Sequence, residues 1–174
     1  MKRFLIVLML LMLSTTVLAA QQGNHNGNML NVGIEYKNFN GFMDYSHLGL
    51  GNLPIYYIGQ NMNYSISIEN GKNNKYNHLV MLVTHREYES KALQPNSEID
   101  EFSGLPYHNR IYLEDFRTSE KFDLSYWVPS NATPGAGQTD VIIYRAYDWT
   151  SDNEGNEWSY GRIILERTLG YFCP

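Results

Sequence analysis

The fold is decided by Met62-Asn63-Tyr64-Ser65-Ile66-Ser67-Ile68-Glu69, in which apolar and polar side chains alternate along the chain. Successive side chains of a β-strand point to opposite faces, so this alternation predicts a strand with one buried and one wet face. The same period of two runs through residues 30–36 and 122–128. These segments predict sheets that rest one face on a core.

Other segments have apolar residues at successive positions, as expected for strands covered on both faces. They are residues 53–58, 79–83, 141–144 and 163–165. The chain therefore contains seven or eight predicted strands, separated by segments rich in Asn, Gly, Pro and Ser. No stretch of ten residues has a 3.6-residue apolar period, so helices should be minor. We predict an all-β sandwich, with a short edge strand or helical turn inside the long 87–109 connection.

Two parts of the chain carry a recognisable pattern of strands and turns. The first begins at Gly59 and ends in Ile68-Glu69-Asn70-Gly71, and the second joins residues 122–129, Ser130-Asn131-Ala132-Thr133-Pro134-Gly135 and residues 141–144. Together they resemble the immunoglobulin-like CARDB and NEW3-type modules of exported bacterial and archaeal proteins. The resemblance implies a single immunoglobulin-like β-sandwich over residues 29–174. It also implies a non-enzymatic adhesion, spacer or accessory role, and it transfers no catalytic residue.

Residues 1–20 have the pattern of a secretory signal peptide. Lys2 and Arg3 precede an apolar run over residues 4–13, which a small-residue exit follows. The run is shorter than the roughly twenty residues that a transmembrane helix needs. We predict cleavage after Ala19 or Ala20, with an uncleaved N-terminal anchor as the alternative. The mature protein would then be secreted or held at the cell surface.

Residues 21–28, which follow the leader, are polar and glycine-containing, and we expect a disordered lead-in there. Without Lys2 and Arg3 the chain has 11 basic and 18 acidic residues. Such a surface repels phosphate backbones, so nucleic acid is not an expected partner. No second hydrophobic segment follows the leader, and we expect no membrane contact once the leader is removed.

The acidic stretch over residues 148–157 is a candidate calcium loop, because carboxylate and carbonyl oxygens are the ligands that Ca²⁺ prefers. Its spacing departs from the EF-hand pattern, since Thr150 stands where the first Asp belongs. A solvated hairpin tip explains the same composition. Both interpretations stay open at this point.

Aromatic side chains flank that acidic stretch at both ends. Planar rings beside hydrogen-bonding groups suit glycan faces and protein contacts alike, whereas ordinary cross-strand packing is the alternative. The predicted ligand-binding residues are Tyr147, Trp149, Asp152, Glu154, Glu157, Trp158 and Tyr160. Alternation also turns Trp127 away from the core, so it is either exposed or covered by the 87–109 connection.

Three residues are candidates for covalent modification. Cys173 is the only cysteine, which allows either an intermolecular disulfide or a small apolar role in the last strand. Asn63 and Asn131 begin triplets that match the N-glycan acceptor pattern.

The sequence has no recognisable catalytic motif. No Gly-x-Ser-x-Gly occurs, and the histidine spacing fits no zinc site. Carboxylate pairs such as Glu114-Asp115, or Glu98 with Asp100, could in principle hydrolyse glycosides. We therefore predict a non-catalytic binding or adhesion module that recognises a surface protein or a glycan. The alternatives are a self-associating subunit of a surface layer or filament, and a small secreted carbohydrate-active enzyme.

Overall fold

The computed structural model describes residues 30–71, 78–114, 116–151 and 155–174, except the side chains of residues 147–162. These residues form β-strands and one 3-10 helix, η1 (Ser46–Leu48), and contain no helix long and apolar enough to cross a membrane. The predicted all-β fold class is confirmed. The strands are β1 (Asn31–Lys37), β2 (Phe42–Asp44), β3 (Asn52–Pro54), β4 (Asn61–Glu69), β5 (Leu79–Glu87), β6 (Glu98–Ile99), β7 (Pro106–Tyr107), β8 (Asn109–Leu113), β9 (Ser119–Trp127), β10 (Gly135–Ser151) and β11 (Gly155–Cys173).

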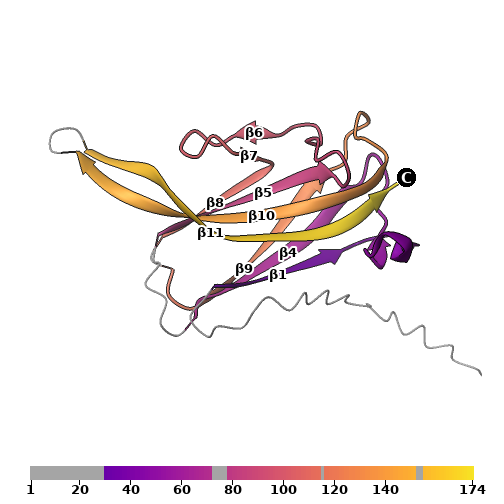
Figure 1. Cartoon of the computed structure of the whole chain (residues 1–174), viewed down its shortest axis with the longest axis horizontal. Helices are drawn as coiled ribbons and strands as arrows, with labels where there is room; N and C mark the ends of the chain where they lie inside the picture. Colours follow the sequence, from indigo (N-terminus) through magenta and orange to yellow (C-terminus); the bar gives the residue numbers. More distant parts are fainter. Residues whose placement is uncertain (1–29, 72–77, 115, 152–154) are drawn as a thin grey trace, which may run out of the picture.

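The strands form two larger antiparallel sheets and two small hairpins. One sheet has the order β1-β4-β9 and the other β11-β10-β5-β8, while β2 pairs with β3 and β6 with β7. Figure 1 shows the two larger sheets stacked as layers. Side chains from both sheets meet in one core, which includes Ile66 of β4, Met81 of β5 and Val141 of β10.

The predicted alternation is visible in the burial of the strands. In β4 the side chains of Met62, Tyr64, Ile66 and Ile68 are buried, as predicted. The segment 79–83 is buried throughout and occupies the interior strand β5. The segment 53–58 is strand only at its start, in β3, and the short strands β6 and β7 lie inside the long connection where a short element was expected.

Tyrosine fills much of the core. The buried tyrosines of the main core are Tyr36, Tyr56, Tyr64, Tyr126 and Tyr171. Tyr36 donates to Thr139 Oγ1 over 2.7 Å, and Tyr126 donates to the Pro95 carbonyl over 3.1 Å. Burial raises the pKa of Tyr126 to about 12, which keeps its hydroxyl a hydrogen-bond donor. These rings supply apolar area, and the hydroxyls of Tyr36 and Tyr126 reach acceptors on other segments.

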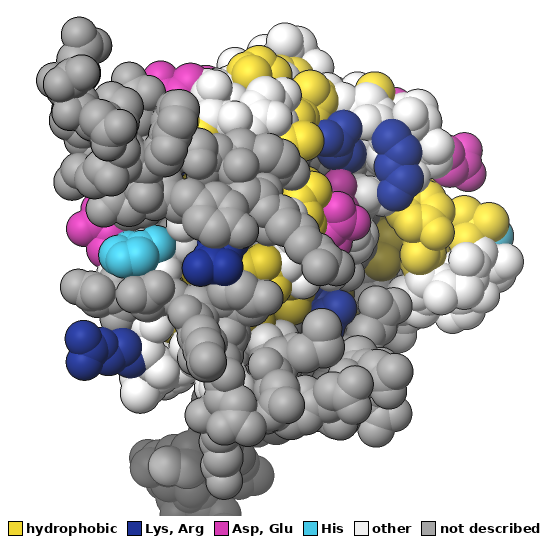
Figure 2. Space-filling view, turned by 60° about the vertical axis from the view of Figure 1, so that its left-hand side comes forward, with side chains coloured by type: hydrophobic (Ala, Val, Ile, Leu, Met, Phe, Trp, Pro, Cys, Tyr) yellow, Lys and Arg dark blue, Asp and Glu magenta, His cyan; other side chains and the backbone are white. Residues whose placement is uncertain are grey.

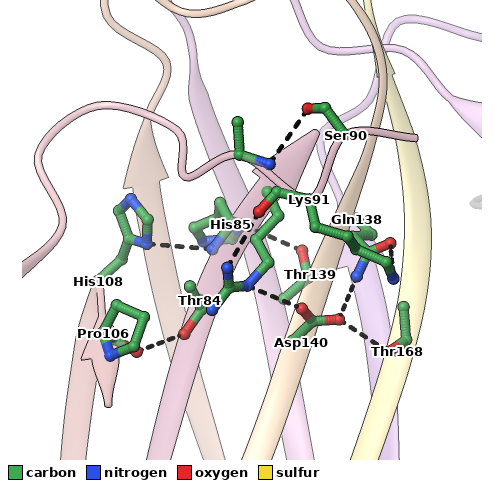
Figure 3. A network of polar contacts seen from close by, with 12 residues as sticks. Thr84, His85, Ser90, Lys91, Pro106, His108, Gln138, Thr139, Asp140 and Thr168 are labelled. Carbon is green, nitrogen blue, oxygen red and sulfur yellow. Dashed lines mark hydrogen bonds and ion pairs between the residues drawn. The ribbon is translucent and has the colours of Figure 1, made fainter. Parts of the chain in front are cut away.

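His85 of β5 lies fully buried between the two sheets. Its Nδ1 is 3.1 Å from Thr139 Oγ1 in the same sheet, and its Nε2 is 3.4 Å from the Tyr64 hydroxyl of the opposite sheet. Its ring stacks on Tyr126 of β9 with 4.3 Å between centroids. Figure 3 shows His85 between His108 and Thr139. This imidazole joins both layers through polar and ring contacts.

The hydrogen-bond directions around His85 follow from Asn109. Tyr64 donates to Asn109 Oδ1 over 2.6 Å, so its oxygen is left to accept from His85 Nε2–H. Nδ1 of His85 then accepts from the hydroxyl of Thr139. Both ring nitrogens are satisfied in the neutral imidazole, whereas a second proton on Nδ1 would displace the hydrogen bond that Thr139 donates.

His108, directly before β8, holds a neighbouring loop against the same region. Its Nδ1 accepts from the backbone N–H of His85 over 3.0 Å. Its Nε2 lies 3.2 Å from the Gln94 carbonyl and 3.1 Å from that of Pro95. Burial lowers the pKa of His108, and a proton on Nδ1 would face an N–H donor. The neutral form is therefore the one that fits.

The long connection covers the outer face of the four-stranded sheet. A second apolar cluster joins Tyr107 and Leu105 of this connection to Val80, Leu82 and Tyr144 of the sheet. Thr84 of β5 also donates to the Pro106 carbonyl over 2.8 Å. One of the two outer faces of the molecule is thus covered by the chain itself.

Acidification should destabilise the protein through His85. Burial, followed by the neighbouring His108, holds the pKa of His85 well below its ordinary value, so below pH 6.5 the unfolded chain binds the proton first. The contribution of the neutral His85 to the free energy of unfolding is complete above about pH 6.5. It shrinks by about 1.4 kcal/mol per pH unit as the pH falls towards the pKa of His85 in the folded protein. Urea unfolding at pH 7 and pH 5 measures it.

The comparison needs a variant without the buried imidazole. His85→Gln should show a smaller loss between pH 7 and pH 5, whereas His47→Gln, at an exposed position of η1, should keep the full loss. An unchanged pH dependence in His85→Gln would contradict the assignment.

Candidate functional site

β10 and β11 continue past the four-stranded sheet as a two-stranded arm, formed by residues 146–151 and 155–160. β5 accompanies β10 only as far as the pair Arg145↔Leu79. β10 and β11 stay paired to Ser151↔Gly155. Figure 1 shows the arm leaving the body of the molecule. Register shifts between Ile143 and Ala146 mark its base, and such irregularities increase the local twist.

The register of the arm divides the predicted ligand-binding residues between two faces. Residues directly opposite each other share a face, and successive residues alternate. Trp149 lies opposite Glu157, while Trp158 lies opposite Asp148. One set of positions therefore holds Tyr147, Trp149 and Glu157, and the other holds Trp158 and Tyr160. Asp152 and Glu154 lie outside the described residues.

The predicted calcium stretch, residues 148–157, falls partly outside the described residues as well. Within the described part of the chain, no group of three or more His, Cys, Asp or Glu side chains could hold a metal ion. Calcium binding by this stretch stays a prediction.

The candidate modification sites lie in different environments. Cys173 is a free cysteine at the end of β11 with 1 % of its surface exposed, and burial raises the pKa of its thiol. This position favours the small apolar role over an intermolecular disulfide. Asn131 is exposed before the start of β10, whereas Asn63 is half-buried on β4.

Glu98 and Asp100, one of the predicted carboxylate pairs, are both engaged in contacts. Asp100 has no exposed surface: it accepts from Arg110 and Tyr144, each over 2.9 Å, and from the Ser103 hydroxyl over 2.5 Å. Burial would raise the pKa of Asp100, but these hydrogen bonds outweigh it and keep the pKa below its ordinary value. Glu98 accepts from the Tyr107 hydroxyl over 2.6 Å. Asp100 thus anchors the long connection to the sheet, and Asp115 of the other pair lies outside the described residues.

The outer face of the β1-β4-β9 sheet is the second candidate surface, here called the open face. Strand alternation from the three registers assigns to it Asn31, Gly33, Glu35, Lys37, Asn61, Asn63, Ser65, Ser67, Glu69, Ser119, Lys121, Asp123, Ser125 and Trp127. All but the last are polar or glycine. Trp127, whose exposure the sequence left undecided, is 53 % exposed.

Other exposed apolar side chains are distributed over several elements. The largest are Phe42, Met43, Leu48, Tyr57, Ile58, Leu93, Ile99 and Tyr112. On the face that Figure 2 presents, the described hydrophobic side chains lie among charged and polar ones. Trp127 differs from these residues because it stands on a regular strand within a sheet face that is otherwise polar.

Comparison with known proteins gives little guidance. No protein-family model matches the chain, and no curated protein matches it. Among solved structures it is similar to a family 123 glycoside hydrolase from Clostridium perfringens, with 16 % sequence identity and a TM-score of 0.31. The match covers 83 % of this chain but 27 % of that structure, so the chain spans about a quarter of its length. A likeness at this level defines neither fold nor activity.

Removal of the Asp100 anchor should destabilise the fold. Asp100→Ala leaves Arg110 and the Tyr144 hydroxyl without this acceptor, so the free energy of unfolding should fall by about 2–4 kcal/mol. Asp123→Ala, which removes an exposed carboxylate paired with Lys37, should leave the urea midpoint nearly unchanged. Equal losses in the two variants would rule out an anchoring role for Asp100.

Proposed function

We propose that this protein is an exported, non-catalytic binding module with an immunoglobulin-like β-sandwich, acting at or outside the cell surface on a protein or a glycan. Export rests on the leader at residues 1–20, with its basic start, apolar run and small-residue exit. Cleavage after Ala19 or Ala20 releases the mature chain.

The strand order supports the immunoglobulin-like part of the proposal. When β1, β4, β5, β8, β9, β10 and β11 take positions A, B, C, C′, E, F and G in chain order, one sheet becomes A-B-E. The other becomes G-F-C-C′. The chain therefore crosses between the sheets in the order that such sandwiches use. The short strands β2, β3, β6 and β7 are additions to that plan.

The arm is the observation that carries the binding role. An isolated two-stranded hairpin is marginally stable in water, yet β10 and β11 remain paired beyond the end of β5. Aromatic positions occur on both of its faces, at Tyr147 and Trp149 on one and at Trp158 and Tyr160 on the other. Aromatic residues often dominate the binding energy of interfaces, so a strand pair that carries four of them suits contact with a partner.

A shortened hairpin tests this function. Joining Tyr147 to Ser159 through Asn-Gly closes the arm with a two-residue turn and keeps every pair between β5 and β10. The shortened protein should unfold at the same temperature but bind its partner at least about tenfold more weakly. Binding is measured against fractionated envelope proteins and an immobilised glycan array.

Two results would count against the proposal. The first is equal binding by the intact and shortened proteins, which would remove the arm from the interface. The second is recovery of the expressed protein inside the cell with residues 1–20 still attached, as measured by mass spectrometry of the N-terminus.

A further inference from the structure

Four charged side chains at the centre of the open face are paired with one another. Lys37 Nζ lies 2.5 Å from Asp123 Oδ1, which joins β1 to β9 across β4. Lys121 Nζ lies 3.5 Å from Glu35 Oε2 and spans the same three strands. In this pair the cation is on β9 and the carboxylate is on β1. Each cation of this cluster has a carboxylate partner, so the centre of the face presents no uncompensated charge to a ligand.

Small side chains lie beneath and beside these two ion pairs. Ser65 donates to Glu35 Oε2 over 3.2 Å and is 2 % exposed, although alternation places it on the outer face. Gly33 sits opposite Ser67, and a Cβ at Gly33 would come within 2.7 Å of the Ser67 hydroxyl. Small polar side chains and a glycine therefore surround the paired charges of this face.

Trp127 stands at one end of this polar face. Its register partner is Asn61, and the next row along the sheet holds Ser125 and Asn63. More than half of the Trp127 surface is exposed, although an indole ring has a large apolar area to bury. The ring is thus flanked by amide and hydroxyl groups at strand spacing.

The backbone next to Trp127 is held by a fixed set of hydrogen bonds. Val128 N–H donates to the Gln60 carbonyl over 3.0 Å, and Gly59 N–H donates to the Val128 carbonyl over 2.7 Å. The Gln60 side chain accepts from Asn40 and donates to the Asn38 carbonyl. The segment that carries the ring is therefore ordered before any ligand binds, which reduces the entropic cost of binding.

We propose that the open face binds a neutral oligosaccharide, with the face of one sugar ring on Trp127 and neighbouring hydroxyls on Asn61, Asn63 and Ser125. Sugars combine an apolar C–H face with a rim of hydroxyls, which matches an indole beside amides. A phosphate or sulfate would need a cation that is not already paired. This site goes beyond the proposed arm interface and uses none of its residues.

The site is separate from the arm in space. At one end of the sandwich, Leu79 pairs with Arg145 at the base of the arm and with Leu113 at the end of β8. β9 begins a few residues after Leu113, at Ser119, so the start of β9 lies at this same end. Trp127 is at the other end of β9, roughly 27 Å along the strand. Variants of one surface should therefore leave the other intact.

The test uses the purified protein and immobilised neutral oligosaccharides of glucose, galactose, mannose and N-acetylglucosamine, with sialylated and sulfated glycans as comparators. We expect binding to at least one neutral glycan that changes little when the salt concentration is raised. Trp127→Ala should weaken it at least about tenfold, equivalent to about 1.4 kcal/mol. Ser125→Arg, which places a long side chain beside the ring, should weaken it as strongly.

The control is Tyr112→Ala, which removes an exposed aromatic ring from β8 of the other sheet and should bind like the parent protein. Thermal unfolding confirms that each variant is folded. The inference is overturned if no neutral glycan binds, if only charged glycans bind, or if both face variants bind normally. It is also overturned if the shortened arm alone abolishes glycan binding, a result that would leave the proposed arm function standing.

Discussion

Hydrogen bonds made by hydroxyl and imidazole groups buried between the two sheets fix how the sheets sit on each other. An apolar core tolerates some sliding, but an unsatisfied buried polar group costs about 1–3 kcal/mol. Tyr36 of β1 donates to Thr139 of β10, and Tyr64 of β4 contacts His85 and Asn109. These contacts cross from the three-stranded to the four-stranded sheet, so a shift of one sheet would break several of them together. The tyrosine-rich interior therefore specifies one arrangement as well as filling space.

The unequal treatment of the two outer faces follows from the same principle. Asp100 is buried only because Arg110, Ser103 and Tyr144 supply its hydrogen bonds, and these partners bring the long connection onto the outer face of the β5 sheet. On the β1-β4-β9 sheet the carboxylates pair instead with lysines across the strands, at the surface. One face becomes a second small core, and the other remains available to ligands.

The sequence predicted the long strands because their alternation depends on local side-chain order alone. β8 was missed because it has five residues and forms a sheet edge, where the apolar pattern is short. The burial of His85 depends on Tyr64, Thr139 and His108, which are distant in sequence, so no local signal indicates it. Alternation likewise placed Trp127 outside the core but left its cover undecided. Whether the 87–109 connection would cover Trp127 depended on the sheet to which Asp100 attaches this connection. That attachment is a property of the assembled fold and has no local sequence signal.

The positions of the two candidate surfaces constrain how the protein could act. The body between the two surfaces is rigid, because its strands are hydrogen-bonded in ladders and its interior is closely packed. The arm begins after Arg145, at one end of the four-stranded sheet, whereas Trp127 is the last residue of β9 and lies at the other end of the molecule's body. A single small ligand cannot touch both. A long glycan or two different partners could, and the body between them would then serve as a rigid spacer that holds two weak contacts at a fixed separation. Such bivalency raises the overall affinity without any new contact, because the second binding event occurs at a high effective concentration.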